Sequence, residues 1–308
     1  MNRADGAAPL RSTEAAPPGG GAWSSQDPLT ALAAFHQADL EAAEAVRRAH
    51  GELARAVDAI AERLARGGRL IYVGAGTSGR LGVLDAAECQ PTFQTAPQTV
   101  QALMAGGEKA LVQAIEGAED DREAGAAGLS ARRPTPSDCV LGISASGGAP
   151  FVHGALEAGR AAGALTVFLA CVPFHQAPDP WDLSIRLDTG PELLAGSTRL
   201  KAGSATKMAL NALSTLVMAR LGKVHGYRMV DVNTGGNRKL WQRGVRMVAE
   251  LCALTSQDAE ALLQAAEGQV KVACVMHSRG VPAEKARECL AQNESRLDRC
   301  LLPPAGAE

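Results

Sequence analysis

Two glycine-rich loops in the middle of the chain hold polar groups that are suited to binding an anion. The first loop reads GAGTSG at residues 74–79 and the second reads SASGG at residues 144–148. Each follows an apolar run typical of a strand and precedes a run typical of a helix. Backbone N–H groups at such turns, together with the helix dipole, bind phosphate well, and the serine and threonine hydroxyls add donors.

The sequence of the first loop alone does not distinguish a nucleotide-binding site from a sugar-phosphate-binding site. It contains the G-x-G-x-x-G pattern of dinucleotide-binding folds, which is a weak signal by itself. That fold also needs an acidic residue about 20 residues later; Glu88 comes too early, and Glu108, after the next strand, nearly meets the requirement. The second loop favours one phosphorylated sugar lying across the carboxyl ends of the strands, although a tight turn would use the same small residues.

The elements around these loops alternate between strand and helix patterns. Strands are expected at 69–73, 99–104, 139–143, 165–170 and 183–187, and helices at 109–116, 151–162 and 204–221 as well as after the first loop. Such alternation predicts parallel strands in a three-layer, doubly wound α/β sandwich.

Both ends of the chain differ from this middle part. Residues 1–28 are rich in Ala, Pro, Gly and Ser and predict a flexible arm, and helical periodicity follows from 29 to 66. After residue 226 only helices are expected, at 239–254, 256–269 and 282–292. We therefore expect an arm at 1–28, an N-terminal helical segment at 29–56, the α/β domain at 57–223 and a small C-terminal helical subdomain at 224–308.

Bulk properties argue against several classes of partner. The formal net charge of −2 gives no general attraction for nucleic acid or acidic membranes. The seven scattered cysteines form no C-x-x-C pair and the six histidines show no metal-ligand spacing, so we expect neither disulfides nor a metal. With no secretory signal and no apolar run of roughly 20 residues, the expected location is the cytoplasm.

Several long motifs, in order, resemble the N-acetylmuramic acid 6-phosphate etherases. GRLIYVGAGTSGRLGVLDAAEC at 68–89 is similar to the core of that family, and IEGAED at 115–120 is similar to its second acidic segment. GPELLAGSTRLKAG at 190–203 resembles a signature that the family shares with the glucokinase regulatory protein, and 222–226 and 229–232 continue it. The similarity covers roughly residues 50–300 and implies a sugar isomerase (SIS) type domain.

This resemblance implies a carbon–oxygen lyase without a cofactor. Such enzymes cleave the D-lactyl ether at C3 of N-acetylmuramic acid 6-phosphate, giving N-acetylglucosamine 6-phosphate and D-lactate. The ring opens, a base removes the C2 proton, lactate leaves by syn elimination, and water adds. By position, Glu88 matches the residue that protonates the departing oxygen, and Glu119 matches the second catalytic glutamate, the expected C2 base.

The resemblance also implies the substrate contacts and a homodimer with its sites at the subunit interface. The substrate-binding residues expected from it and from the loops are Gly76, Thr77, Ser78, Ser144, Ser146, Gly147, Ser197, Thr198 and Lys201. Lys201 could also be an exposed lysine at the start of a helix, and either glutamate could be an ordinary surface acid.

The chain departs from the family pattern near the presumed phosphate. The family's second loop usually reads A-A-S-G-R-T-P, whereas Gly148 and Ala149 stand here in place of the arginine and threonine. The family's N-terminal T-E-x-R-N stretch survives only as Thr13-Glu14.

Two other functions are considered. A non-catalytic sugar-phosphate regulator would not need both glutamates. An aldose–ketose isomerase would share ring opening and C2 deprotonation but would never release lactate.

Overall fold

The computed structural model describes residues 10–301, which form two compact units. The first unit contains residues 10–85 and 101–213, and the second contains 86–100 and 214–301. Two long helices contribute to both units, α3 (Gly76–Phe93) and α6 (Lys201–Arg220).

A five-stranded sheet forms the centre of the first unit. Its strands are β1 (Leu70–Gly74), β2 (Val100–Met104), β3 (Cys139–Ser144), β4 (Leu165–Ala170) and β5 (Leu183–Arg186), in the spatial order β2-β1-β3-β4-β5. The pairs from β1 to β5 are parallel, with Leu70 opposite Cys139 and Val167 opposite Leu183. The predicted doubly wound parallel sheet is confirmed, and each strand lies within one residue of its predicted range.

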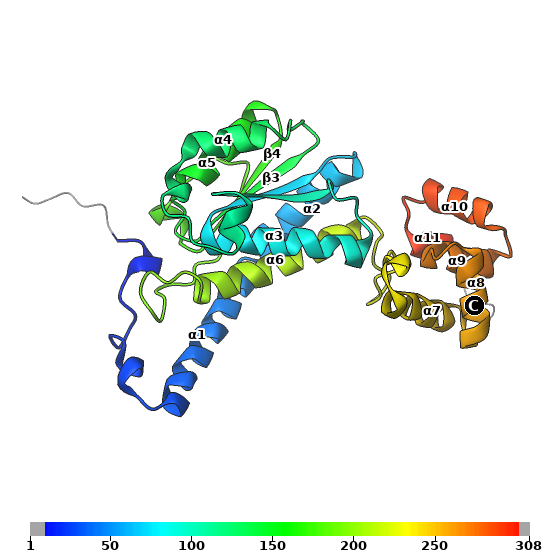
Figure 1. Cartoon of the computed structure of the whole chain (residues 1–308), viewed down its shortest axis with the longest axis horizontal. Coiled ribbons are helices and arrows are strands. Elements are labelled where there is room, and N and C mark those ends of the chain that lie inside the picture. The colour runs from blue at the N-terminus through cyan, green and yellow to red at the C-terminus, as the bar shows by residue number, and fades with distance from the viewer. Residues whose placement is uncertain (1–9, 302–308) are drawn as a thin grey trace, which may run out of the picture. The chain divides into compact units, whose positions relative to one another are not determined.

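Helices cover both faces of this sheet, so the predicted three layers are present (Figure 1). On one face, α4 (Arg122–Ser130) and α5 (Pro150–Ala161) bury Ile71 and Val73 of β1 in an apolar cluster. On the other face lie α2 (His50–Ala65), α3 and the start of α6 (Figure 1). There the hydroxyl of Tyr72 donates a hydrogen bond to Asp85 Oδ2 of α3 at 2.8 Å.

The N-terminal helices agree with the helical pattern at 29–66. Helix α1 (Pro28–Arg48) starts after Asp27, whose Oδ1 accepts from the backbone N–H groups of Leu29 and Thr30 at 3.1 and 3.2 Å. It ends at Ala49, where α2 begins. Three leucines of α1 remain largely exposed within the single chain: Leu29, Leu32 and Leu40, at 81%, 62% and 51%.

The prediction of a helix at 109–116 is wrong. Only a short 3-10 turn forms there, Glu108–Leu111. The apolar residues that suggested a helix find no surface to pack against, since Val112 is 83% exposed and Ile115 is 41% exposed. A segment this short is not stable as a helix without such packing.

Helix α4 is among the helices that the sequence did not predict. Glycines lower its helical propensity, but they allow close packing. A Cβ on Gly125 would overlap the carbonyl of Phe151 on α5, and one on Gly128 would lie 2.9 Å from the Leu103 side chain. Packing against α5 and β2 thus outweighs the local preference.

The second unit is helical, as expected after residue 226. It contains α7 (Arg238–Cys252), α8 (Ser256–Ala265), α9 (Val270–Arg279), α10 (Ala283–Gln292) and α11 (Leu297–Cys300) around a core that includes Val248, Leu263 and Cys274. The helix predicted at 256–269 is shorter, because Glu267 and Gly268 take positive φ values of 55° and 78° and end it. Within residues 10–301, no helix has both the length and the apolar character needed to cross a membrane.

Candidate functional site

The topology of the sheet predicts a crevice between β1 and β3. These strands are neighbours, but the chain leaves β1 into α3 on one face and leaves β3 into α5 on the other. At such a switch point the two loops separate beyond the carboxyl ends of the strands, where open α/β sheets bind ligands.

A cavity of about 220 Å³ lies at this position. It brings together seven of the residues expected to act on or bind the substrate: Gly76, Thr77, Ser78, Glu119, Ser144, Ser146 and Thr198. The two glycine-rich loops therefore line one cavity, as expected from their places after parallel strands.

The first loop presents the start of α3 to the cavity. It is tight: a Cβ on Gly79 would lie 2.6 Å from the carbonyl oxygen of Gly74. The N–H of Gly79 donates to the carbonyl of Ala75 at 3.2 Å, so the helix begins at Gly76. The first N–H groups of a helix have no partner within it, and here they belong to residues that line the cavity. Together with the helix dipole they favour a bound anion.

The second loop presents the start of α5 in the same way. Ser144 is buried, and its Oγ accepts from the N–H of Ala149 at 3.3 Å. Gly147 turns the chain with φ of 78°, and its carbonyl oxygen lies 3.1 Å from Nε2 of His153. No side chain caps the start of α5 at Ala149. Two helix N-termini thus converge on one cavity.

The start of α6 differs from those of α3 and α5, because a carboxylate of the protein, that of Glu192, accepts from its first N–H groups. The fully buried Glu192 accepts from the N–H groups of Lys201 and Ala202 at 2.8 and 3.0 Å. Burial raises the pKa of Glu192, and these hydrogen bonds offset that effect only in part. Lys201 is buried too, and its Nζ forms a 2.6 Å ion pair with Glu41. The hydrogen bond from Lys201 lowers the pKa of Glu41.

Three predicted substrate-binding residues lie outside the cavity lining, as does the predicted catalytic residue Glu88. Lys201 directs its charge at Glu41, Ser197 is half-buried with its N–H bonded to the carbonyl of Leu194 at 2.9 Å, and Gly147 lies between the lining residues Ser146 and Ala149.

The two predicted catalytic glutamates lie in different units. Glu119 belongs to the 3-10 turn Ala118–Asp120 of the first unit, which follows Gly117 with its φ of 74°, and it is exposed at the cavity. Glu88 is exposed on the part of α3 that belongs to the second unit.

One charged residue of the cavity lining was not predicted, Glu14. It follows the buried Thr13, whose carbonyl accepts from the N–H of Gly196 at 3.2 Å. The match of Thr13-Glu14 to the family's N-terminal stretch is the signal that could have identified it. Of the predicted arm, residues 1–9 lie outside the described residues, and the flexibility expected for 1–28 stays a prediction.

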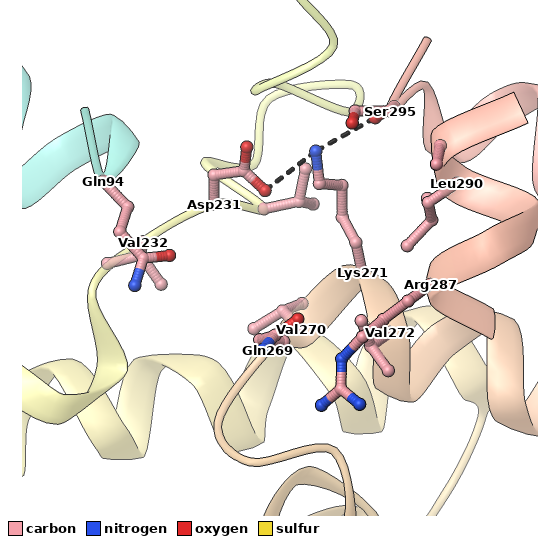
Figure 2. A pocket seen from close by; sticks show the side chains of 12 residues that line it. Gln94, Asp231, Val232, Gln269, Val270, Lys271, Val272, Arg287, Leu290 and Ser295 are labelled. Atoms are coloured by element: carbon pink, nitrogen blue, oxygen red, sulfur yellow. Dashed lines mark hydrogen bonds and ion pairs between the residues drawn. The ribbon is translucent and has the colours of Figure 1, made fainter. Parts of the chain in front are cut away.

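The second unit holds a separate cavity of about 320 Å³ (Figure 2). Its buried Lys271 forms a 2.9 Å ion pair with Asp231 and donates to the carbonyls of Ser295 and Gly222 at 2.9 and 3.3 Å. All three N–H groups of this ammonium are therefore used within the unit. Arg287 in turn pairs with Glu267 at 2.8 Å. The candidate site is therefore the cavity of the first unit, where the two glycine-rich loops meet.

The described residues contain no group of three or more His, Cys, Asp or Glu side chains that could hold a metal ion. The seven cysteines are all free thiols.

Comparison with known proteins gives a consistent result. The family model of the glucokinase regulatory protein N-terminal SIS domain matches residues 52–160. A protein of Rippkaea orientalis (strain PCC 8801 / RF-1) named N-acetylmuramic acid 6-phosphate etherase is 52% identical over 270 residues, covering 88% of each chain. A protein of Gloeobacter violaceus with the same name is 56% identical over 243 residues, covering 79% of each. A solved phosphoheptose isomerase of Francisella tularensis is 16% identical with a TM-score of 0.49, covering 63% of this chain and all of that one.

Proposed function

The chain belongs to the N-acetylmuramic acid 6-phosphate etherase family, and on this premise we propose that it cleaves the D-lactyl ether of N-acetylmuramic acid 6-phosphate. The observation that supports the location of the site is that the starts of two helices and a glutamate line one cavity. The helix starts suit the 6-phosphate, and the glutamate suits a proton transfer.

In the proposed reaction, Glu119 acts as the base. With the sugar ring open, the aldehyde at C1 acidifies the C2 proton, which passes to the Glu119 carboxylate. The electron pair of the C2–H bond becomes the C2–C3 double bond as the C3–O bond breaks. Glu119 is exposed at the cavity, so its carboxylate can reach a substrate held by the two loops.

Glu88 acts as the acid in this scheme. Its proton passes to the lactate oxygen as that oxygen departs, because an alkoxide is a poor leaving group without protonation. Water then adds at C3 and a proton returns to C2, so the net products are N-acetylglucosamine 6-phosphate and D-lactate. The role rests on the position of Glu88 in the segment that resembles the family core.

Contacts to the phosphate are assigned to the two loops. We propose that Thr77, Ser78, Ser144 and Ser146 donate to its oxygens, with the N–H group of Gly76. The N–H of Gly147 donates instead to the carbonyl of Ser144 at 3.0 Å, so the substrate contact predicted for Gly147 stays a prediction. Ser197 and Thr198 would then border the sugar, and the role predicted for Lys201 stays a prediction.

We also propose that the protein is a homodimer in the cytoplasm. The exposed leucines of α1 form an apolar face that a second copy could cover. Seven free thiols suit a reducing compartment.

The first experiment is to incubate the purified protein with N-acetylmuramic acid 6-phosphate and to measure D-lactate with a coupled dehydrogenase. Release of lactate is expected, and Glu88→Ala should reduce it by about 10²- to 10⁴-fold. The matched control is Glu123→Gln, which changes an exposed glutamate of α4 and should keep the wild-type rate.

Solvent exchange separates the two glutamates. In deuterated water, Glu88→Ala should still exchange the C2 proton, whereas Glu119→Gln should not. Loss of exchange in Glu88→Ala, with exchange kept in Glu119→Gln, would reverse the assignment. If the wild-type protein only binds the sugar, shown as protection against thermal unfolding, it is a regulator; if it forms a ketose, it is an isomerase.

A further inference from the structure

The cavity of the first unit has a deficit of positive charge for its proposed ligand. Its lining includes the carboxylates Glu14 and Glu119, and among the described residues that line it there is no lysine or arginine. Lys201, the cation expected there, is paired with Glu41. A phosphate dianion binds best where charged donors are added to backbone N–H groups.

A short N-terminal segment, residues 11–15, forms hydrogen bonds beside this cavity. The N–H of Ser12 donates to Gln176 Oε1 at 2.8 Å, and the carbonyl of buried Thr13 accepts from Gly196 at 3.2 Å. Between these points a 3-10 turn, Ser12–Glu14, holds the backbone. The position of Arg11 therefore depends on contacts with the segments that follow β4 and β5.

The guanidinium of Arg11 lies over the second loop. Its Nη1 donates to Ser146 Oγ at 3.3 Å, and Ser146 lines the cavity. This contact uses one of the five N–H groups of an arginine. In residues 10–301, no carboxylate forms an ion pair with Arg11, so its charge is left for a ligand.

Gly148 makes room for this guanidinium. Its φ is outside the left-handed region, so the backbone does not require a glycine there. A Cβ at this position would instead overlap the Arg11 side chain, lying 2.8 Å from Cζ. The absence of a side chain at residue 148 and the presence of Arg11 are thus two parts of one arrangement.

We propose that Arg11 supplies the cation of the phosphate site, reaching it from the N-terminal segment through the space that Gly148 leaves open. This inference rests on the proposed function. Arg11 is a binding residue in this scheme: it pairs with the 6-phosphate and takes no part in proton transfer.

Steady-state kinetics of lactate release tests this assignment. Arg11→Ala should raise KM for N-acetylmuramic acid 6-phosphate by about 10- to 100-fold, since a charged hydrogen bond is lost, and should change kcat by less than about threefold. Inhibition by inorganic phosphate should weaken by a similar factor. The matched control is Arg66→Ala, which should leave KM and kcat unchanged. Arg66 lies where α2 ends before β1, and so at the amino ends of the strands, away from the cavity at their carboxyl ends.

Moving the charge gives a second test that a merely structural role would not pass. Gly148→Arg alone should bind the substrate poorly, because its side chain meets Arg11. The double variant Arg11→Ala/Gly148→Arg should have a KM at least tenfold lower than that of Arg11→Ala. In this variant the guanidinium belongs to a residue of the second loop and no longer meets Arg11. Thermal unfolding of each variant shows that it is folded.

Two results would overturn the assignment. One is an Arg11→Ala variant with unchanged KM and unchanged phosphate inhibition. The other is a loss in kcat alone, which would mean that Arg11 positions the catalytic groups. A wild-type protein that releases no lactate would contradict the proposed function instead, and the binding of inorganic phosphate to wild type and Arg11→Ala, measured by calorimetry, would still decide on Arg11.

Discussion

At the level of single residues, the proposed site contains small hydroxyl side chains from its two glycine-rich loops. Ser78 is 9% exposed and Ser144 is 5% exposed, and both line the cavity. The sequence was sufficient to predict these residues, because each loop follows a strand directly. It could not predict that Arg11 lies against Ser146, 135 positions away, since that contact depends on the folded path of the N-terminal segment.

Replacing Ser78 should weaken substrate binding. Ser78→Ala removes a hydroxyl donor to a charged phosphate, a hydrogen bond worth about 1.5 to 3 kcal/mol, so KM should rise by about tenfold or more. Lactate-release kinetics measures the effect, with Ser130→Ala, an exposed serine of α4, as the control. An unchanged KM would remove Ser78 from the phosphate contacts.

At the level of elements, Asp138 joins the starts of β1 and β3. It is 1% exposed and accepts from the backbone N–H and the guanidinium of Arg69 and from Thr135. Burial raises the pKa of Asp138, but the hydrogen bonds from Arg69 and Thr135 and the charge of Arg69 outweigh it, so the pKa lies below its ordinary value.

Asp138→Asn should therefore destabilise the first unit by about 2 to 4 kcal/mol at neutral pH. A lowered folded-state pKa contributes stability above the unfolded-state pKa, about 4, and this contribution is lost as the pH falls through the folded value. The difference in free energy of unfolding between wild type and variant should thus disappear below about pH 4. Urea unfolding from pH 3 to 7.5 measures it, with Asp188→Asn, an exposed aspartate, as control. A gap that does not depend on pH would contradict this explanation.

The turn between β1 and α3 should not tolerate a methyl group. Gly79→Ala places a Cβ 2.6 Å from the Gly74 carbonyl oxygen, which should cost about 1 to 3 kcal/mol of stability and lower lactate release. Gly51→Ala, in α2, has no atom within 4 Å of the added Cβ and should stabilise by about 0.5 to 1 kcal/mol. Denaturant unfolding compares them. Equal stability of the two variants would refute the steric argument.

Secondary structure was predicted correctly from the sequence where burial follows a simple period. It was predicted wrongly where packing against a neighbouring element determines whether a helix forms. Strands β1, β3 and β4 are buried almost throughout and come from largely apolar runs. The segment 109–116 has an apolar period without a surface to pack against, and α4 has glycines that would weaken it if it did not pack tightly on α5. Neither outcome can be read from the local residues, because both depend on the neighbouring element.

At the level of the whole molecule, the proposed dimer depends on the exposed face of α1. Leu32→Asp puts a charge into an apolar interface, which should shift the protein towards monomers in sedimentation velocity. Tyr227→Asp, at an 82% exposed residue of the second unit, should leave the dimer intact. A wild-type protein that sediments as a monomer at micromolar concentration would refute the dimer.

The convergence of two helix starts on one cavity has a consequence for how the sequence can change over generations. The N–H groups at the starts of α3 and α5 belong to the main chain, so a substitution that preserves the helices leaves them in place unless it introduces a proline. The side chains around them can then differ, because the main chain still provides donors for the anion. A lineage can lose an arginine from a loop and gain one from a distant part of the chain, while the anion site persists throughout.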